Sequence, residues 1–367
     1  MGVDELAGPY YVDWAVGDDS NAGTSEGAGN AWKTITKAMN TVAAGETVYV
    51  KATGPYLETA TIVTAGTISG TITFEGYTST PGDGGQATID GESTRSYCVT
   101  YTVPITSTTK LFYEFKNFIF KRADFYNVNV SWDLVFRNCR FTNATQYGCD
   151  VRTGCLFENC LFDNNGAGGL NVGGQVTTVV GCRFENNTSD GAQITAESCF
   201  IDCVFVGNGF DAFEDFGVNG SYCVLVNCTI DGDGKTTNIG IDLGTSFWKR
   251  AAVVNCIIYD CDEGIDAINQ GTRFISRNNL LNSNNTNYPG SRFQTFTGEV
   301  TSAPQFVDEA GGNYALAGAS PARDAGYDGY LLNGSDQLRD IGAIESTSAA
   351  GAGGGASQVL KDGSQMV

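Results

Sequence analysis

A short motif, glycine–apolar–polar–apolar, returns along the chain and carries a polar side chain at its third position. The third-position residues are Asp150, Asn171, Gln193, Glu214, Asp242 and Asp266. If these motifs are stacked strands, neighbours lie about 5 Å apart and second neighbours about 10 Å apart, which brackets the carboxylate separations of glycosidases. Mutual repulsion would raise the pKa of one carboxyl group and supply a general acid. Glu214, Asp242 and Asp266 are therefore the candidate catalytic residues.

The same residues have two other interpretations. An acidic chain can present a solvated carboxylate face that forms no site. Further acidic residues close in sequence add to this surface: Asp211, Asp215, Asp260, Asp262 and Glu263. Alternatively, carboxylates at this spacing could hold Ca²⁺ or bind sugar hydroxyls without turnover. Ca²⁺ is the one cofactor that this pattern indicates, and the pattern does not single out particular metal ligands. The candidate carbohydrate-binding residues are Asp150, Asn171, Gln193, Trp248, Lys249 and Arg250.

The composition excludes several classes of chemistry. The 367 residues include no histidine, which removes Ser-His-Asp and Cys-His nucleophiles, histidine metal ligands and a histidine pH switch. The 41 acidic and 21 basic side chains give a net charge of −20, which argues against a nucleic-acid partner. No apolar run approaches the roughly 18 residues of a membrane span, so no membrane partner is expected.

A ladder of cysteine-centred repeats supplies the elements that would position the polar residues. Its members are Asn117-Phe118-Ile119-Phe120, Asn138-Cys139-Arg140-Phe141, Asn159-Cys160-Leu161-Phe162, Gly181-Cys182-Arg183-Phe184, Asp202-Cys203-Val204-Phe205, Asn227-Cys228-Thr229-Ile230, Asn255-Cys256-Ile257-Ile258 and Asn278-Asn279-Leu280-Leu281. They recur every 21 to 28 residues. Within a member, the cysteine and the next apolar residue but one would share one face of a strand.

Short strands, Asn/Gly corners and this period predict an all-β fold of parallel coils, one coil for each repeat. In such coils the ladder cysteines would form an inward column, because a small apolar thiol suits a stacked interior. The members of this column are Cys139, Cys160, Cys182, Cys203, Cys228 and Cys256. Reduced, buried thiols are the expectation, with disulfides between coils or a thiolate metal row as the alternatives.

Three further regions make a resemblance specific. The first runs from Ala31-Trp32-Lys33-Thr34-Ile35 to Gly45-Glu46-Thr47-Val48-Tyr49-Val50, the second is Thr71-Ile72-Thr73-Phe74-Glu75-Gly76-Tyr77, and the third comprises Ser320-Pro321-Ala322-Arg323-Asp324-Ala325-Gly326 and Asp340-Ile341-Gly342-Ala343-Ile344-Glu345. With the ladder, they resemble the pectate-lyase-like superfamily over about residues 30–346. The resemblance implies a single-stranded right-handed parallel β-helix, a solenoid with a short N-terminal capping helix. Trp32, Ile35, Met39 and Val42 would lie on one face of that helix.

The resemblance leaves the activity open, because lyases, hydrolases, epimerases and non-catalytic virion spikes share this fold. A lyase would need a cationic base beside Ca²⁺, for which Lys249 and Arg250 are the first candidates and Arg152 the second. The polygalacturonase-like pattern includes a histidine, which this chain lacks. No catalytic residue is therefore carried over from the family.

The expected organisation has three parts. Residues 1–30 form a lead-in segment, and residues 31–346 form the β-helix domain. Within that domain we expect a cap at 31–50, regular coils at about 111–285 and an irregular closing region at 286–346. Residues 347–367 form a tail rich in Gly, Ala and Ser, a composition typical of a flexible segment.

Two functions from different classes follow. The first is a structural or adhesive β-helix of a phage particle, such as a tail spike, fibre or capsid decoration, with surface polysaccharide as its ligand. No visible signal peptide, an intact Met1, the lack of histidine and the lack of a matched catalytic motif favour it. We then expect a virion or extracellular protein that is cytoplasmic during synthesis, with copies of itself (a trimer is one arrangement) or other virion proteins as partners. The alternative is an enzyme, a polysaccharide lyase or glycoside hydrolase acting on an acidic polysaccharide.

Overall fold

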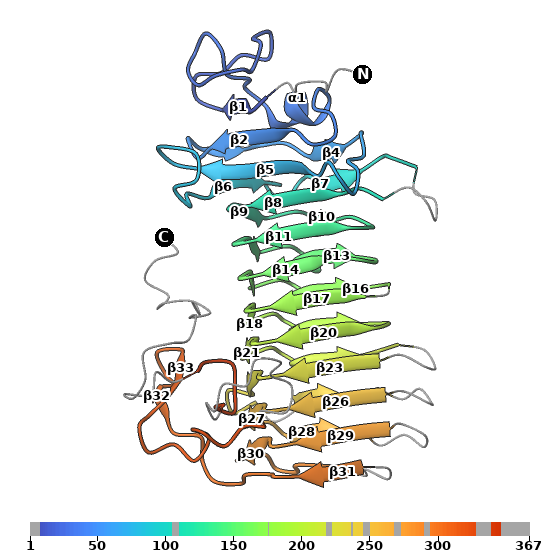
Figure 1. Cartoon of the computed structure of the whole chain (residues 1–367), viewed down its shortest axis with the longest axis vertical. Coiled ribbons are helices and arrows are strands. Elements are labelled where there is room, and N and C mark those ends of the chain that lie inside the picture. The colour runs from blue at the N-terminus through green and yellow to red at the C-terminus, as the bar shows by residue number, and fades with distance from the viewer. Residues whose placement is uncertain are drawn as a thin grey trace. The chain divides into compact units, whose positions relative to one another are not determined.

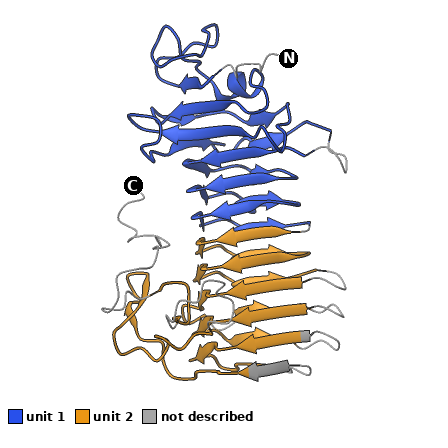
Figure 2. Cartoon of the chain, viewed as in Figure 1, with its two compact units in different colours: residues 1–174 blue, residues 175–367 orange. Residues whose placement is uncertain are grey.

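The computed structural model describes residues 8–104, 110–174, 176–217, 222–235, 238–244, 250–267, 273–289, 294–327 and 339–345. The chain forms two compact units, residues 1–174 (unit 1) and residues 175–367 (unit 2) (Figure 2). Among the described residues, no helix has the length and apolar character needed to cross a bilayer.

Unit 1 is built from three parallel sheets, A, B and C (Figure 1). Sheet A contains β1 (Tyr10–Asp13), β2 (Thr47–Lys51), β5 (Ile72–Tyr77), β8 (Tyr113–Lys116), β11 (Leu134–Arg137) and β14 (Leu156–Glu158). Sheet B contains β3 (Pro55–Tyr56), β6 (Ala87–Asp90), β9 (Phe118–Lys121), β12 (Arg140–Thr142) and β15 (Leu161–Asp163). Sheet C contains β4 (Ala60–Ile62), β7 (Tyr97–Tyr101), β10 (Tyr126–Asn129), β13 (Cys149–Val151) and β16 (Leu170–Val172).

Unit 2 repeats this plan. Sheet A here contains β17 (Thr177–Val180), β20 (Ser198–Ile201), β23 (Tyr222–Val226), β26 (Arg250–Val254), β29 (Arg273–Arg277) and β31 (Gln294–Thr297). Sheet B contains β18 (Arg183–Glu185), β21 (Val204–Val206), β24 (Thr229–Asp231), β27 (Ile257–Tyr259) and β30 (Leu280–Asn282). Sheet C contains β19 (Ala192–Ile194), β22 (Phe213–Asp215), β25 (Ile239–Asp242) and β28 (Glu263–Asp266), and β32 (Phe306–Asp308) pairs with β33 (Asn313–Leu316) in an antiparallel hairpin.

Each coil visits the sheets in the order A, B, C, and the next coil pairs with it in parallel. The turn from sheet A to sheet B is set by one residue in the left-handed region, such as Asn138 at φ 51° and Asn227 at φ 52°. Asparagine tolerates this conformation better than other side chains with a Cβ. The turn side chains also bond along the stack, because Asn138 Nδ2 donates to Asn117 Oδ1 over 2.7 Å.

Side chains that point into the coils stack on their equivalents in the next coil. Phe136 lies between Phe115 and Phe157, with ring centroids 5.5 and 5.1 Å away, and Phe141 stacks on Phe162 at 4.7 Å. The ladder cysteines follow the turn residues and are at most 2% exposed. Their Sγ atoms face main-chain carbonyls, as Cys139 does with Phe115 O at 3.5 Å. The inward cysteine column predicted from the sequence is therefore present within each unit, as free thiols.

A short helix, α1 (Ile35–Met39), packs against β1 and β4 of unit 1. Thr34 caps it by accepting a hydrogen bond from Lys37 N at 3.0 Å, and the Glu58 carboxylate accepts from Ile35 N and Thr36 N at 2.8 Å each. Carboxylate oxygens at a helix start satisfy its free N–H groups and complement its dipole. All four residues predicted to form the apolar face are buried, but the helix contains only Ile35 and Met39, and Trp32 and Val42 lie in the segments on either side of it. The fold prediction, an all-β right-handed parallel β-helix with a short N-terminal capping helix, is confirmed.

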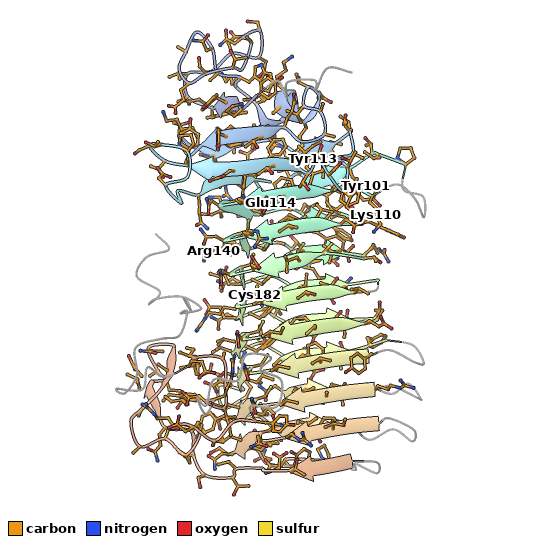
Figure 3. All side chains as sticks on the ribbon, in the orientation of Figure 1. Tyr101, Lys110, Tyr113, Glu114, Arg140 and Cys182 are labelled. Atoms are coloured by element: carbon orange, nitrogen blue, oxygen red, sulfur yellow. The ribbon has the colours of Figure 1, made fainter. Side chains whose placement is uncertain are left out.

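The outward faces of the coils are not alike. Glu114, labelled in Figure 3, lies on sheet A of unit 1. It pairs with Arg137 at 2.8 Å and with Lys116 at 3.3 Å. Arg140, on sheet B, holds the buried Asp163 through two bonds of 2.8 and 2.7 Å. On sheet B of unit 2, three outward positions are apolar instead (Val204, Ile257 and Leu280), and the chain itself covers them.

That cover is a C-terminal strap, formed by residues 306–327 and 339–345. Leu316, Ala322 and Ile341 pack on the outward Ile257 and Leu280, and Tyr314 and Ala343 pack on Val204. Hydrogen bonds fix the strap to the coils: Tyr314 OH donates to Asp231 Oδ2 at 2.6 Å, Ala343 N to Thr229 Oγ1 at 2.9 Å, and Gly342 N to Asn255 O at 2.7 Å. The segment expected to close the domain thus lies along the side of sheet B.

Candidate functional site

The predicted polar column lies on sheet C in both units. In unit 1, Asp150 on β13 is in register with Asn171 on β16. In unit 2, Gln193, Glu214, Asp242 and Asp266 are in register from β19 to β28. The three candidate catalytic residues therefore occupy successive coils, as the sequence pattern predicts. Their catalytic role remains a prediction.

Neighbours in the column bond to one another. Asn171 Nδ2 donates to Asp150 Oδ1 at 2.6 Å in unit 1, and Gln193 Nε2 donates to Glu214 Oε2 at 2.6 Å in unit 2. Asp242 accepts a hydrogen bond from Gly244 N at 2.6 Å. Each of the two amides is thus bonded to a carboxylate, whereas Glu214, Asp242 and Asp266 follow one another without an amide between them.

Two further aspartates, from the turns, lie beside Glu214. Asp190 and Asp211 each lie three residues before a column residue, Gln193 and Glu214 respectively, in the turns that lead into β19 and β22. Carboxylate oxygens of Asp190, Asp211 and Glu214 all lie within 4.8 Å of one another. We call these three residues the acidic cluster. Main-chain N–H groups support it: Asp211 N donates to Asp190 Oδ1 at 3.2 Å, and Ile239 N to Asp211 Oδ1 at 3.3 Å.

Burial and crowding change the titration of the cluster. Desolvation, followed by the charges of Asp242, Asp190 and Glu214, raises the pKa of Asp211 to about 8. The pKa of Asp190, which is 5% exposed, is also raised, first by burial. At neutral pH the cluster therefore retains a proton. A divalent cation could replace that proton, because hard carboxylate oxygens at this separation are the ligands that Ca²⁺ prefers.

The remaining candidates are distributed differently. Arg250 is exposed at the start of β26 and pairs with Tyr222 on sheet A, not with the sheet C column. Trp248 and Lys249 lie outside the described residues. Arg152 follows β13 directly and acts electrostatically on Asp150. Sequence reasoning missed Asp190, although its offset from Gln193 equals that of Asp211 from Glu214, and this shared offset is the signal that could have found it.

Comparisons with known proteins agree on the architecture. The family described as the right-handed β-helix region matches residues 125–288. Among solved structures, the chain is similar to a pectate lyase, Pel9A, with 18% identity and a TM-score of 0.59 over 93% of this chain and 97% of that one. It is also similar to XylC solved in complex with xylose, with 8% identity and a TM-score of 0.51 over 81% and 87% of the two chains.

A protein from Geobacillus virus E2, ORF18, is 17% identical, with a TM-score of 0.41 over 73% of this chain and 57% of that one. No curated protein matches the sequence. At these identities the matches to Pel9A and XylC establish the fold, and the fold alone.

Proposed function

Because the chain is a right-handed parallel β-helix with an acidic cluster on sheet C, we propose that it binds an acidic polysaccharide through a divalent cation, as a structural or adhesive protein. The observation that carries this proposal is the convergence of Asp190, Asp211 and Glu214 oxygens within 4.8 Å. A chain with a net charge of −20 repels a polyanion. A bound cation would turn the cluster from a repulsive site into an attractive one.

Ca²⁺ is the cation that fits this donor set best. It takes 6–8 oxygen ligands in flexible geometry. The cluster residues would supply part of that shell, and sugar carboxylates and water would supply the rest. Asp242, which already influences both Asp190 and Asp211, would add negative charge at its edge.

The setting of this activity is part of the proposal. We place the protein on a phage particle, where a β-helix without histidine and without a matched catalytic motif would serve adhesion. Copies of the same chain or other virion proteins would be its partners there, a trimer being one such arrangement. These assignments rest on the sequence pattern.

Binding can be tested with pectate, the polymer that appears in the name of the structural relative Pel9A, a pectate lyase. The method is affinity electrophoresis in gels that contain pectate with either 2 mM CaCl₂ or EDTA. We expect retardation of the wild-type protein in Ca²⁺ and a loss of at least about tenfold in affinity for Asp211→Asn, since a charge-assisted ligand is removed. The exposed Asp124→Asn is the matched control and should behave as wild type. Equal retardation of Asp211→Asn and the wild type in Ca²⁺ would contradict the proposal.

A second candidate function is turnover of the same polymer by a lyase or glycoside hydrolase mechanism. It is favoured by one observation, the raised pKa of Asp211, because a protonated carboxyl beside ionised ones can divide acid and base roles. Glu214, Asp242 and Asp266 remain the proposed catalytic residues. New ultraviolet-absorbing unsaturated ends would indicate a lyase and new reducing ends a hydrolase, and Asp242→Asn should abolish either. Binding without any new ends supports the adhesive function.

A further inference from the structure

A second feature of sheet C lies in unit 1 and consists of aromatic rings. Tyr97 opens β7 and is in register with Tyr126, which opens β10 (Figure 1). Tyr147 stands at the equivalent position of the next coil, with its ring centroid 6.1 Å from that of Tyr126. The Tyr97 and Tyr126 centroids are 6.2 Å apart, and Phe125 packs on Tyr126 at 4.4 Å. We call these four residues the aromatic ladder.

The ladder differs from the other aromatic stacks of unit 1 in its exposure. Phe115, Phe136 and Phe141 point into the coils and are fully buried. The ladder rings point outward: Phe125 is 38% exposed, and Tyr97, Tyr126 and Tyr147 are half-buried. Outward aromatic rings aligned coil by coil leave apolar faces in water, and such patches mark binding surfaces more often than isolated exposed residues do.

Charged and polar groups stand beside the rings. Asp150 and Arg152 both act electrostatically on the Tyr126 phenol, so they share its surroundings. Asn171 holds Asp150 through its 2.6 Å hydrogen bond. A Cβ on Gly173 would come within 2.8 Å of Arg152 Nη1, so the guanidinium lies directly over this glycine. Apolar ring faces with a few placed polar groups are the usual composition of a ligand site.

We propose that the aromatic ladder binds successive sugar rings of a polysaccharide, with Arg152 pairing with a ring carboxylate and without any metal ion. The negative faces of aromatic rings attract the weakly positive C–H edges of a sugar ring, and tyrosine adds a hydroxyl that can bond to sugar hydroxyls. Guanidinium is the side-chain group best matched to a carboxylate. The choice of an acidic polymer rests on the proposed function. The assignment of the binding residues, and the prediction that binding needs no cation, rest on the aromatic ladder itself.

The test uses the full chain in EDTA, which removes the contribution of the acidic cluster. Binding of polygalacturonate and of neutral galactan is measured by isothermal titration calorimetry for the wild type, Tyr126→Ala, Tyr97→Ala and Arg152→Gln. Tyr222→Ala is the matched control, because Tyr222 is 45% exposed but belongs to sheet A of unit 2. Circular dichroism and urea midpoints confirm that each variant is folded.

We expect the wild type to bind polygalacturonate in EDTA, and each tyrosine-to-alanine change in the ladder to weaken binding about tenfold, as the loss of one aromatic contact predicts. Arg152→Gln should weaken polygalacturonate binding and leave galactan binding unchanged. If the wild type binds neither polymer in EDTA, or if folded ladder variants bind as tightly as Tyr222→Ala, the ladder is not a sugar site. Loss of Ca²⁺-dependent binding in Asp211→Asn alone would instead concern the acidic cluster.

Discussion

At the scale of single residues, the acidic cluster shows how a shared coil position creates a chemical environment that no one residue has. Asp211 is a turn residue before β22, and in isolation its carboxyl would titrate near 3.8. Stacking brings Asp190 and Glu214 beside it and partly removes all three from water. The cluster therefore stores electrostatic repulsion that proton or cation binding relieves.

This repulsion gives a pH dependence with a definite sign. The unfolded chain releases the Asp211 proton near pH 3.8, whereas the folded chain keeps it until about pH 8. Folding therefore takes up a proton in this window, and the free energy of unfolding should fall as pH rises, by at most about 1.4 kcal/mol per pH unit. The stabilising contribution is complete below pH 3.8 and lost through pH 8.

Urea unfolding in EDTA at several pH values between 4 and 9 measures the slope. Asp211→Asn should flatten it, and Asp124→Asn, a change at an exposed site, should not. Identical slopes for the wild type and Asp211→Asn would show that folding does not raise the pKa of Asp211 in solution.

The candidate site was predictable from the sequence where its residues repeat. Glu214, Asp242 and Asp266 follow from the third position of the motif, because residues that share a repeat position share a column. Asp190 and Asp211 lie in turns outside the motif, so their shared offset from Gln193 and Glu214 is the only sequence signal that places them near the column. The motif does not indicate the aromatic ladder, because Tyr97 and Tyr126 lie in coils without a copy of the motif and Tyr147 directly precedes the first copy.

At the scale of elements, the strap converts an apolar outward face into core. Ile257 and Leu280 lie on the outer side of sheet B, where a solvated coil would carry polar residues, and both are fully buried. Leu316 and Ile341 supply the covering surface. The coils are predictable because each carries the same inward and outward alternation. The position of the strap is not predictable in this way, because the strap contacts the coils through single apolar residues that do not recur at a fixed spacing.

Truncating a strap residue should therefore be as costly as truncating a core residue. Ile341 is fully buried, so Ile341→Ala should lower the free energy of unfolding by about 2–4 kcal/mol through lost burial and the cavity left behind. Ile68, which is 87% exposed, offers the same chemical change without burial, so Ile68→Ala should lie within about 0.5 kcal/mol of the wild type. Urea midpoints for the two variants decide the matter, and equal midpoints would mean that the strap is loosely attached.

At the scale of the whole molecule, the interior is lined with thiols that solvent does not reach. All twelve cysteines are free, and Cys199 is the one that is not fully buried. Burial raises the pKa of Cys199 to about 11, which slows even this thiol at neutral pH. Solvent access to the thiols thus reports the opening of the coils, in unit 1 through Cys139 and Cys160 and in unit 2 through Cys203 and Cys256.

A thiol-labelling experiment tests this arrangement. With a maleimide at pH 7.5 and no denaturant, intact mass should show at most one label, at Cys199, within minutes, and Cys199→Ser should show none. The other thiols should react only as urea unfolds the unit that contains them. Rapid labelling of all twelve cysteines in the native state would contradict the inward placement of the cysteine column.

Because equivalent turn residues recur in successive coils, such a chain can gain or lose whole coils. Asn138 and Asn159 share one turn position and one φ of 51°, and the strands around them are in register coil for coil. Loss or duplication of the segment from Asn138 to Glu158 would rejoin equivalent turns, and the neighbouring coils would meet the same kind of surface as before. Loss of a single strand residue would exchange inside for outside in everything that follows it in that strand. The natural unit of variation in this architecture is the coil, so genes for related proteins should differ by whole coils or in the turns between the sheets.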